Sequence, residues 1–188
     1  MSEDYMVRFA APTLAGLKTG SLFTCDYESR ENFLREAREY DRLLSPRGVR
    51  LLVLRFSDRR ALVYIYRPAL LARDLRAPAA ARFLREEGYA DLRPGRCLGR
   101  LVEKLRAPGG FPHEIGLFLG YPPEDVLGFI RTGGRNCKCV GCWKVYGDAE
   151  RAKKLFASYE RCTEIYCRSC QRGIPLQRLA VALGPCHL

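Results

Sequence analysis

Histidine is scarce in this sequence, which has two among 188 residues, together with one tryptophan and two methionines. The motifs H-E-x-x-H and G-x-S-x-G, the Walker loop and G-x-G-x-x-G are all absent. These absences remove the signatures of metalloproteases, serine hydrolases and nucleotide-binding enzymes, so we expect a protein that is not a typical enzyme. His113 is expected to make ordinary hydrogen bonds at the edge of a strand. His187, beside Cys186, is expected to be disordered near the chain end.

Long apolar runs are also missing, because none reaches the roughly 18 to 20 residues that a membrane helix needs. The N-terminal MSEDYMVRF is acidic at its start and lacks the apolar stretch of a signal peptide. We therefore expect a cytoplasmic protein with no membrane span, in which the nine cysteines are reduced. A hydrophobic content of 47% is enough for a core. The length predicts a single domain over residues 1–188.

Lysine is rare too, since six of the 32 basic residues are lysines, yet the net charge is +11. Residues 42–106 hold 16 basic and 6 acidic side chains (+10), and residues 131–172 hold 10 and 4 (+6). Basic blocks of this kind attract nucleic acid or an acidic protein partner. Arginines on solvated helix faces explain the same excess, and no recognised nucleic-acid-binding motif accompanies it. Binding of nucleic acid or of an acidic partner is therefore an alternative function.

The first third of the chain contains the clearest strand and helix patterns. Residues 21–25 predict a short strand. Apolar residues at helical spacing predict an amphipathic helix from Ser29 to Leu44, with Ser29 as N-cap. The branched and aromatic runs 49–56 and 61–66 predict two strands joined by a polar hairpin loop.

The middle of the chain predicts helices and one further strand. Residues 69–106 predict two or three helices broken by proline and glycine, and residues 107–110 have the composition of a linker. The apolar run 113–121 predicts a buried strand, followed by a short helix from Pro123 to Ile130.

The last third predicts a strand at residues 142–146 and a long helix from Ala149 to about Gln171, capped by Asp148, before a final helix after Pro175. Strands and helices therefore follow each other in mixed order. We predict an α/β or α+β fold with a mixed sheet of about four or five strands and helices packed on it.

Six of the nine cysteines fall in a cysteine-rich part, residues 131–172: Cys137, Cys139, Cys142, Cys162, Cys167 and Cys170. Thiolates spaced as in Cys139-x-x-Cys142 and Cys167-x-x-Cys170 can surround one soft metal ion. The sequence thus suggests a four-thiolate zinc site or iron–sulfur cluster. Cys162 lies roughly 12 Å from Cys170 along a helix axis, so it needs a separate role.

Two other interpretations of the cysteines stay open. The three on the long helix share its apolar face, where cysteine often packs as a small hydrophobe. Cys137 and Cys139 are flanked by Arg135 and Lys138, and neighbouring cations increase the thiolate fraction of a cysteine. A thiol-dependent enzyme using Cys137 or Cys139 is therefore a third possible function.

Five blocks carry a resemblance to a known family: APTLAGLKTGSLF at 11–23, HEIGLFLGYPPEDVLGFI at 113–130, NCKC at 136–139, WKVYG at 143–147 and CTEIYCR at 162–168. In these blocks the chain resembles a bacterial family of unknown function found mainly in anaerobes. Within the first block, residues 11–18 combine a turn, two small residues and a lysine, Lys18, that can face a pocket; as composition alone they indicate only a loop.

The resemblance implies one domain and no established activity. It also implies that relatives share Cys137, Cys139, Cys162 and Cys167, a ligand set different from the two Cys-x-x-Cys pairs. The resemblance points towards iron or redox physiology. We therefore expect an accessory protein of iron or redox homeostasis whose cysteines bind metal or respond to redox state.

Overall fold

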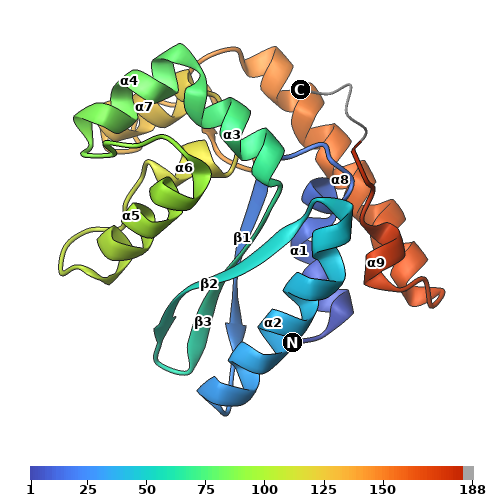
Figure 1. The fold of residues 1–188 in the computed structure, drawn as a ribbon. Helices are drawn as coiled ribbons and strands as arrows, with labels where there is room; N and C mark the ends of the chain where they lie inside the picture. The colour runs from blue at the N-terminus through green and yellow to red at the C-terminus, as the bar shows by residue number, and fades with distance from the viewer. Residues whose placement is uncertain (184–188) are drawn as a thin grey trace.

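The computed structural model describes residues 1–183, and a three-stranded sheet lies at its centre (Figure 1). The strands β1 (Gly20–Asp26), β2 (Arg50–Ser57) and β3 (Arg60–Tyr66) pair in the order β1, β3, β2, with both pairs antiparallel. The strands predicted at 21–25, 49–56 and 61–66 are therefore confirmed. Helices pack on both faces of this sheet, which makes the fold α+β.

Side chains of β3 alternate between two cores because successive residues of a strand point to opposite faces. Ala61, Val63 and Ile65 belong to the first core. Tyr64 is fully buried in the second core, on the other face of the sheet. The two-residue period in the sequence thus decides which helices each face of the sheet contacts.

Helices α1 (Glu3–Leu14) and α2 (Arg30–Leu44) cover the first face, together with the short α9 (Leu176–Leu179). The hydroxyls of Ser2 and Ser29 cap the first two helices by accepting hydrogen bonds from backbone N–H groups in the first turn. A 3-10 turn, η1 (Ser45–Arg47), leads from α2 into β2.

The second face is covered by the helices that follow β3 in the chain. These are α3 (Pro68–Arg76), α4 (Pro78–Glu86), α5 (Pro94–Arg106) and α6 (Ile115–Phe118). The first three begin with proline, whose fixed φ angle and missing N–H suit the first position of a helix. Three helices are thus found where the sequence predicts two or three.

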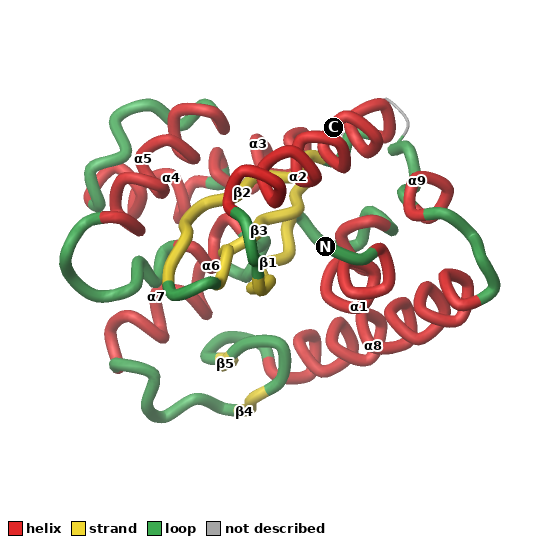
Figure 2. The backbone as a smooth tube through the Cα atoms, turned by 90° about the horizontal axis from the view of Figure 1, so that it is seen from below, coloured by secondary structure: helices red, strands yellow, loops and turns green. Residues whose placement is uncertain are grey.

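The last part of the chain forms a third, smaller core beside the sheet. This part of the chain contains α7 (Pro123–Thr132), a hairpin of β4 (Cys139–Val140) and β5 (Lys144–Val145), and the 23-residue α8 (Ala149–Gln171). Asp148 caps α8, since its carboxylate accepts a hydrogen bond from the Arg151 N–H at 3.0 Å. Figure 2 shows α8 passing along α1, with the hairpin near its start and α9 near its end.

Three expectations from the sequence need correction. The predicted strand at 113–121 is wrong, because these residues form turns and the single-turn helix α6. The five strands that the structure shows form two separate antiparallel sheets instead of one mixed sheet. The helix α1 was not expected, although Met6, Val7, Ala10 and Leu14 lie on its buried side.

No helix in residues 1–183 is long and apolar enough to cross a membrane.

Arg67 joins three parts of the chain in the interior. Its side chain is 1% exposed and donates to the carbonyl oxygens of Thr13 (2.6 Å), Leu14 (2.5 Å), Val181 (2.8 Å) and Arg47 (3.4 Å). Burial lowers the pKa of the guanidinium from its ordinary value, and Tyr166 opposes this shift. The end of α1, the turn η1 and the C-terminal segment are thus held by one cation.

Replacing Arg67 by methionine should therefore destabilise the protein by about 3 kcal/mol, since four carbonyls lose a donor and the bonds to Thr13 and Leu14 are buried. For a chain of this size the melting temperature should fall by roughly 6 to 12 °C, as measured by circular dichroism. Arg82→Met is the matched control, because Arg82 is exposed and only pairs with Glu86 on the same helix. That control should change stability by less than about 0.5 kcal/mol. Equal stability of the two variants would contradict the role given to Arg67.

Candidate functional site

The largest concentration of unusual polar groups lines a cavity of about 450 Å³ beside the third core. The turn between α1 and β1, the end of α3, the turn between α6 and α7, the β4–β5 hairpin and the first half of α8 all contribute to its walls. Its polar lining includes Lys18, Thr19, Arg73, Asp74, Tyr121, Glu124, Arg151 and Tyr159. We take this cavity as the candidate site and refer to it as the central cavity.

The turn after α1 is fixed by backbone hydrogen bonds, and this fixes Lys18. The N–H groups of Leu17 and Lys18 both donate to the carbonyl of Pro12, at 2.9 and 3.1 Å. On the far side of the turn, the Thr19 carbonyl accepts from the Arg67 N–H at 2.9 Å. Lys18 is therefore presented to the central cavity from a rigid turn.

The ammonium of Lys18 lies 5.3 Å from the centroid of the Tyr121 ring. Within residues 1–183 it makes no hydrogen bond or ion pair. Burial lowers the pKa of Lys18 from 10.5 to about 8, an effect that the Cys142 thiolate would partly oppose. About a tenth of this amine is therefore neutral at pH 7.

Two phenols line the same cavity and keep their protons. Burial, and to a smaller extent Cys142, raises the pKa of Tyr121 to about 12. Burial also raises the pKa of Tyr159 well above its ordinary value. The Tyr121 hydroxyl donates to the Cys142 carbonyl at 3.3 Å, and the Tyr159 hydroxyl donates to the Leu17 carbonyl at 3.4 Å. The Tyr121 hydroxyl thus connects the turn between α6 and α7 to the hairpin. The Tyr159 hydroxyl connects α8 to the turn that carries Lys18.

Asp74 closes the side of the central cavity formed by α3. Its carboxylate accepts from the Thr19 hydroxyl and, at 2.9 Å, from Arg73 Nε. Gly120 packs against this group with φ +76°, and a Cβ there would lie 2.8 Å from the Thr19 hydroxyl oxygen. A glycine is therefore required where the α6–α7 turn approaches Thr19.

Asp125 holds the β4–β5 hairpin against α7. Its buried carboxylate accepts from Trp143 Nε1, Tyr146 N and Gly147 N, all at 2.7 Å. Trp143 then stacks on Tyr121 with ring centroids 4.6 Å apart. Through this chain of contacts, one aspartate places the tryptophan that forms the wall of the cavity.

The other face of Trp143 borders a smaller, mainly apolar recess of about 290 Å³. His113 lies at this recess, where its ring contacts Phe129 edge-on with centroids 4.9 Å apart. His113 precedes α6 and not a strand, so its expected place at a strand edge is wrong. Cys186 and His187 lie outside the described residues.

The cysteines are divided between distant parts of the fold. Cys139 packs in the third core with Phe156, near the start of α8, and Cys142 interacts with Lys18. Cys167 and Cys170 pack instead against the first core, near the other end of α8 (Figure 2). From Phe156 to Cys167 the helix rises roughly 16 Å at 1.5 Å per residue.

The two Cys-x-x-Cys pairs therefore do not surround one ion in this structure, because a zinc–sulfur bond is about 2.3 Å long. Among the residues that the structure describes, no group of three or more histidine, cysteine, aspartate or glutamate side chains is arranged to hold a metal. Cys162 is buried in α8, and Cys137 lies half-buried before β4.

Burial disfavours the thiolate at several cysteines. It raises the pKa of Cys142 and Cys162 and, with help from Asp4, raises the pKa of Cys170 to about 11. The cations beside Cys137 and Cys139 bind backbone carbonyls: Lys138 Nζ donates to Gly147 at 2.6 Å and Arg135 Nε to Thr132 at 3.3 Å. Lys138 and Arg135 thus donate to main-chain oxygens among the described residues.

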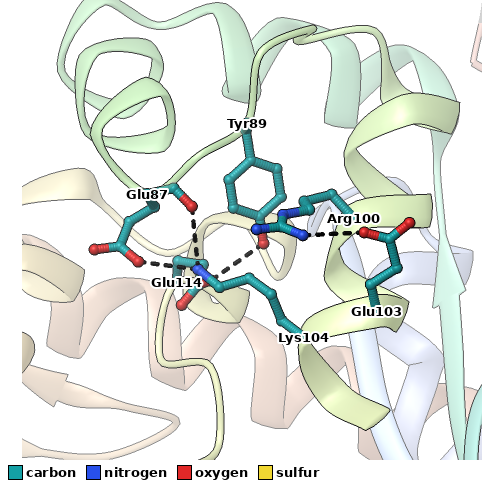
Figure 3. Close-up of polar contacts among 6 residues, drawn as sticks. All are labelled: Glu87, Tyr89, Arg100, Glu103, Lys104 and Glu114. Atoms are coloured by element: carbon teal, nitrogen blue, oxygen red, sulfur yellow. Dashed lines mark hydrogen bonds and ion pairs between the residues drawn. The ribbon is translucent and has the colours of Figure 1, made fainter. Parts of the chain in front are cut away.

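A second polar cluster lies between α4, α5 and α6 (Figure 3). Lys104 Nζ contacts the carboxylates of Glu87, at 2.9 Å, and of the buried Glu114, which also accepts from the Tyr89 hydroxyl at 3.2 Å. On the outside of α5, Arg100 pairs with Glu103 at 3.1 Å. Because the groups of this cluster satisfy one another, we assign it to joining α5 with the segment before α6.

The basic block 42–106 includes a shallow surface recess on the arginine-rich helices. Arg76, Arg85 and Arg93 come to it from three different segments. Arg93 is already paired with Asp91, whose pKa this arginine lowers to about 2. The recess thus gathers part of the basic charge on one surface.

A protein-family model described as "Protein of unknown function (DUF3793)" matches residues 6–180, which is nearly the whole chain. The chain belongs to the DUF3793 family. This confirms the resemblance to a family of unknown function. No curated protein and no solved structure matches the sequence.

Three of the five sequence blocks named above meet at the central cavity. The block 11–23 supplies Lys18, the block 113–130 supplies Tyr121 and Asp125, and the block 143–147 supplies Trp143. The sequence indicated a lysine facing a pocket, but it missed Asp74 and Tyr159, which come from α3 and α8. Their only signal was a polar side chain on the inward side of an amphipathic helix.

Removing the Asp125 carboxylate should release the β4–β5 hairpin, because three donors lose their shared acceptor. We expect Asp125→Ala to cost about 2 kcal/mol in unfolding free energy. The emission of Trp143, the chain's single tryptophan, should shift to the red and become more accessible to acrylamide. The neighbouring Glu124→Ala is the control, with emission like that of the wild type. An unshifted spectrum in Asp125→Ala would contradict the role given to this carboxylate.

Proposed function

We propose that this DUF3793 protein binds a small polar organic molecule in the central cavity, with Lys18 as the group that contacts the ligand. The observation that supports this most directly is the amine itself, which lines a cavity of about 450 Å³ without a hydrogen-bond acceptor in residues 1–183. An acceptor oxygen of a ligand would satisfy it. Cavities of this size accommodate small metabolites.

The energetics of Lys18 favour a functional role over a structural one. One pKa unit corresponds to about 1.4 kcal/mol, so lowering the lysine pKa from 10.5 to about 8 costs the folded state up to about 3 kcal/mol at pH 7. A methionine would fill the same position without that cost. Destabilising polar groups of this kind are typical of binding and active sites.

The walls of the cavity limit the chemistry of the ligand. Apolar contacts come from Leu70, Leu117 and Leu155, and aromatic contacts come from Tyr121 and Trp143. Charged side chains of both signs surround them, so the site suits a compact molecule with polar groups at its ends. A long apolar ligand would leave these charges without partners.

Lys18→Met should separate stability from binding. At pH 7 we expect the variant to unfold at a higher denaturant concentration than the wild type. The native lysine binds fewer protons than the unfolded one between about pH 8 and pH 10.5, so wild-type stability rises through that window. The difference between the two proteins should therefore shrink above pH 8. The free energy of unfolding is measured by urea titration at pH 7, 8, 9 and 10.

The binding arm uses thermal shift and Trp143 fluorescence with a panel of compact carboxylic acids, hydroxy acids and 2-oxo acids. We expect at least one class to stabilise the wild type and to lose this effect in Lys18→Met. Lys144→Met is the matched control, since Lys144 is exposed and its Nζ donates to the Gly134 carbonyl at 2.8 Å. Equal binding by Lys18→Met and the wild type would refute the role of this lysine.

The metal-binding or redox function of the cysteines remains an alternative proposal, as does a role in iron or redox homeostasis. It is favoured by the presence of Cys137, Cys139 and Cys142 within six residues of one turn and hairpin. Elemental analysis of protein purified anaerobically without a metal-affinity tag tests it. About one zinc or iron per chain, lost in Cys139→Ser, would support a metal site.

Binding of nucleic acid or an acidic partner is the other alternative, and the recess lined by Arg76, Arg85 and Arg93 favours it. Such binding would weaken steeply with salt, because each phosphate contact releases a counterion. Fluorescence anisotropy with a labelled oligonucleotide at several salt concentrations tests this proposal, with Arg76→Ala/Arg85→Ala as the variant.

A further inference from the structure

We propose that Lys18 is a nucleophilic amine that forms an imine with a 2-oxo acid bound in the central cavity. This inference rests on the proposed function and specifies its ligand class and chemistry. It starts from the position of the amine, which lies within the cavity and beside the Tyr121 ring. The residue as a whole is half-buried, and it reaches solvent only through the cavity that it lines.

An imine-forming lysine must lose its proton at working pH and must not be tied up in an ion pair. Lys18 meets both conditions, since its pKa is lowered to about 8 by burial and no carboxylate in residues 1–183 pairs with it. A lysine of pKa 10.5 is roughly 300-fold less deprotonated at pH 7. The titratable and charged groups facing this cavity are Asp74 and Arg73 on α3, Tyr121 before α7, Glu124 and Asp125 on α7, Cys142 in the hairpin, and Asp148, Arg151 and Tyr159 at α8.

The reaction needs no oxidant or reductant. The lone pair of Nζ attacks the carbonyl carbon, forming a C–N bond, while the π electrons of the carbonyl move to its oxygen, which takes a proton. Loss of that oxygen as water, together with the remaining proton on nitrogen, leaves a C=N bond. The products are one imine and one water for each amine and carbonyl consumed.

Groups for the proton transfers line the same cavity. The hydroxyls of Tyr121 and Tyr159 line the cavity, and by leaving the carbonyls of Cys142 and Leu17 they can donate to the departing oxygen. The Asp74 carboxylate accepts hydrogen bonds from Thr19 and Arg73 and is the base on the opposite wall. An acid and a base therefore flank the amine from different elements.

The carboxylate of a 2-oxo acid needs a cation other than Lys18, because the imine uses that nitrogen. Arg73 is paired with Asp74 at 2.9 Å, but the guanidinium of Arg151 has no ion pair among the described residues. Arg151 is exposed on the first turn of α8 and lines the same cavity. Arg151 is therefore the cation available to the carboxylate of a 2-oxo acid, a group that a simple aldehyde lacks.

Reductive trapping tests the proposal directly. The full-length protein is incubated with pyruvate or glyoxylate and sodium cyanoborohydride, and the adduct is located by peptide mass spectrometry. We expect a mass increase equal to the oxo acid less one oxygen atom, at Lys18 first, and at least about tenfold faster than at any of the other five lysines. The rate should rise with pH and level off above about pH 8.

Three variants make the outcome specific. Lys18→Arg keeps a positive charge at this position but has no primary amine to form an imine, so the adduct should vanish. Arg151→Met should weaken labelling by pyruvate more than labelling by propanal, which has no carboxylate. Lys144→Arg is the control and should be labelled at Lys18 like the wild type.

The possible results separate this inference from the proposed function. Equal labelling of all lysines, or labelling of Lys18 only after unfolding in urea, overturns the imine. If oxo acids bind and no adduct forms at Lys18, the imine fails and the binding proposal holds. If the panel of acids neither binds nor forms adducts, both proposals fail together.

Discussion

The placement of the candidate site depends on a buried cation that pairs with no carboxylate in residues 1–183. Arg67 is neutralised by the carbonyl dipoles of Thr13 and Leu14 at the end of α1, where the helix dipole is negative, and by two further carbonyls. Its own N–H binds the carbonyl of Thr19. One residue later Pro68 begins α3, the helix that carries Asp74. The turn that carries Lys18 and the helix that carries Asp74 are thus joined by the backbone hydrogen bond between Thr19 and Arg67. The distance between these two walls of the central cavity is therefore fixed by the backbone and not by side-chain rotamers.

Asp125, a buried residue of opposite charge, fixes the geometry of the other side of the cavity. Its three donors place Trp143, and through it Tyr121, where they face Lys18. Both buried charges are satisfied mainly by polar groups that cannot leave, namely backbone carbonyls, backbone N–H groups and an indole. Such partners do not titrate near neutral pH. The walls therefore keep their geometry over the pH range in which the pKa of Lys18, about 8, lets its charge change.

Local sequence signals predicted the elements whose pattern is complete within a short window. The branched and aromatic runs 49–56 and 61–66 predicted both strands of the hairpin, and Asp148 with the apolar face that follows it predicted α8. The run 113–121 misled because a short apolar segment is compatible with a buried strand or a buried helix. The choice of a helix over a strand depends here on contacts that Ile115 and Phe118 of α6 make with residues distant in the sequence. In α1, the turn-like Ala11-Pro12-Thr13 obscured a helical pattern, since proline inside a helix is uncommon. The central cavity could not be predicted from local sequence patterns, because five segments that are separated in the sequence form its walls.

The cysteines illustrate why nearness in sequence is a poor measure of a shared site. Cys139 packs beside Phe156 in the first half of α8, whereas Cys167 lies near the end of this helix, and a helix separates its residues by 1.5 Å per position. The same helix, however, brings Tyr159 to the turn of Lys18, 141 positions away, because α8 packs along α1 and so runs past the end of that helix. Burial favours the protonated form of the Cys162 and Cys170 thiols on α8, whereas it favours the neutral form of the Lys18 amine. Burial therefore has opposite consequences for reactivity: it makes the thiols poorer nucleophiles and the lysine a better one. The chemistry of this fold is for that reason expected at Lys18.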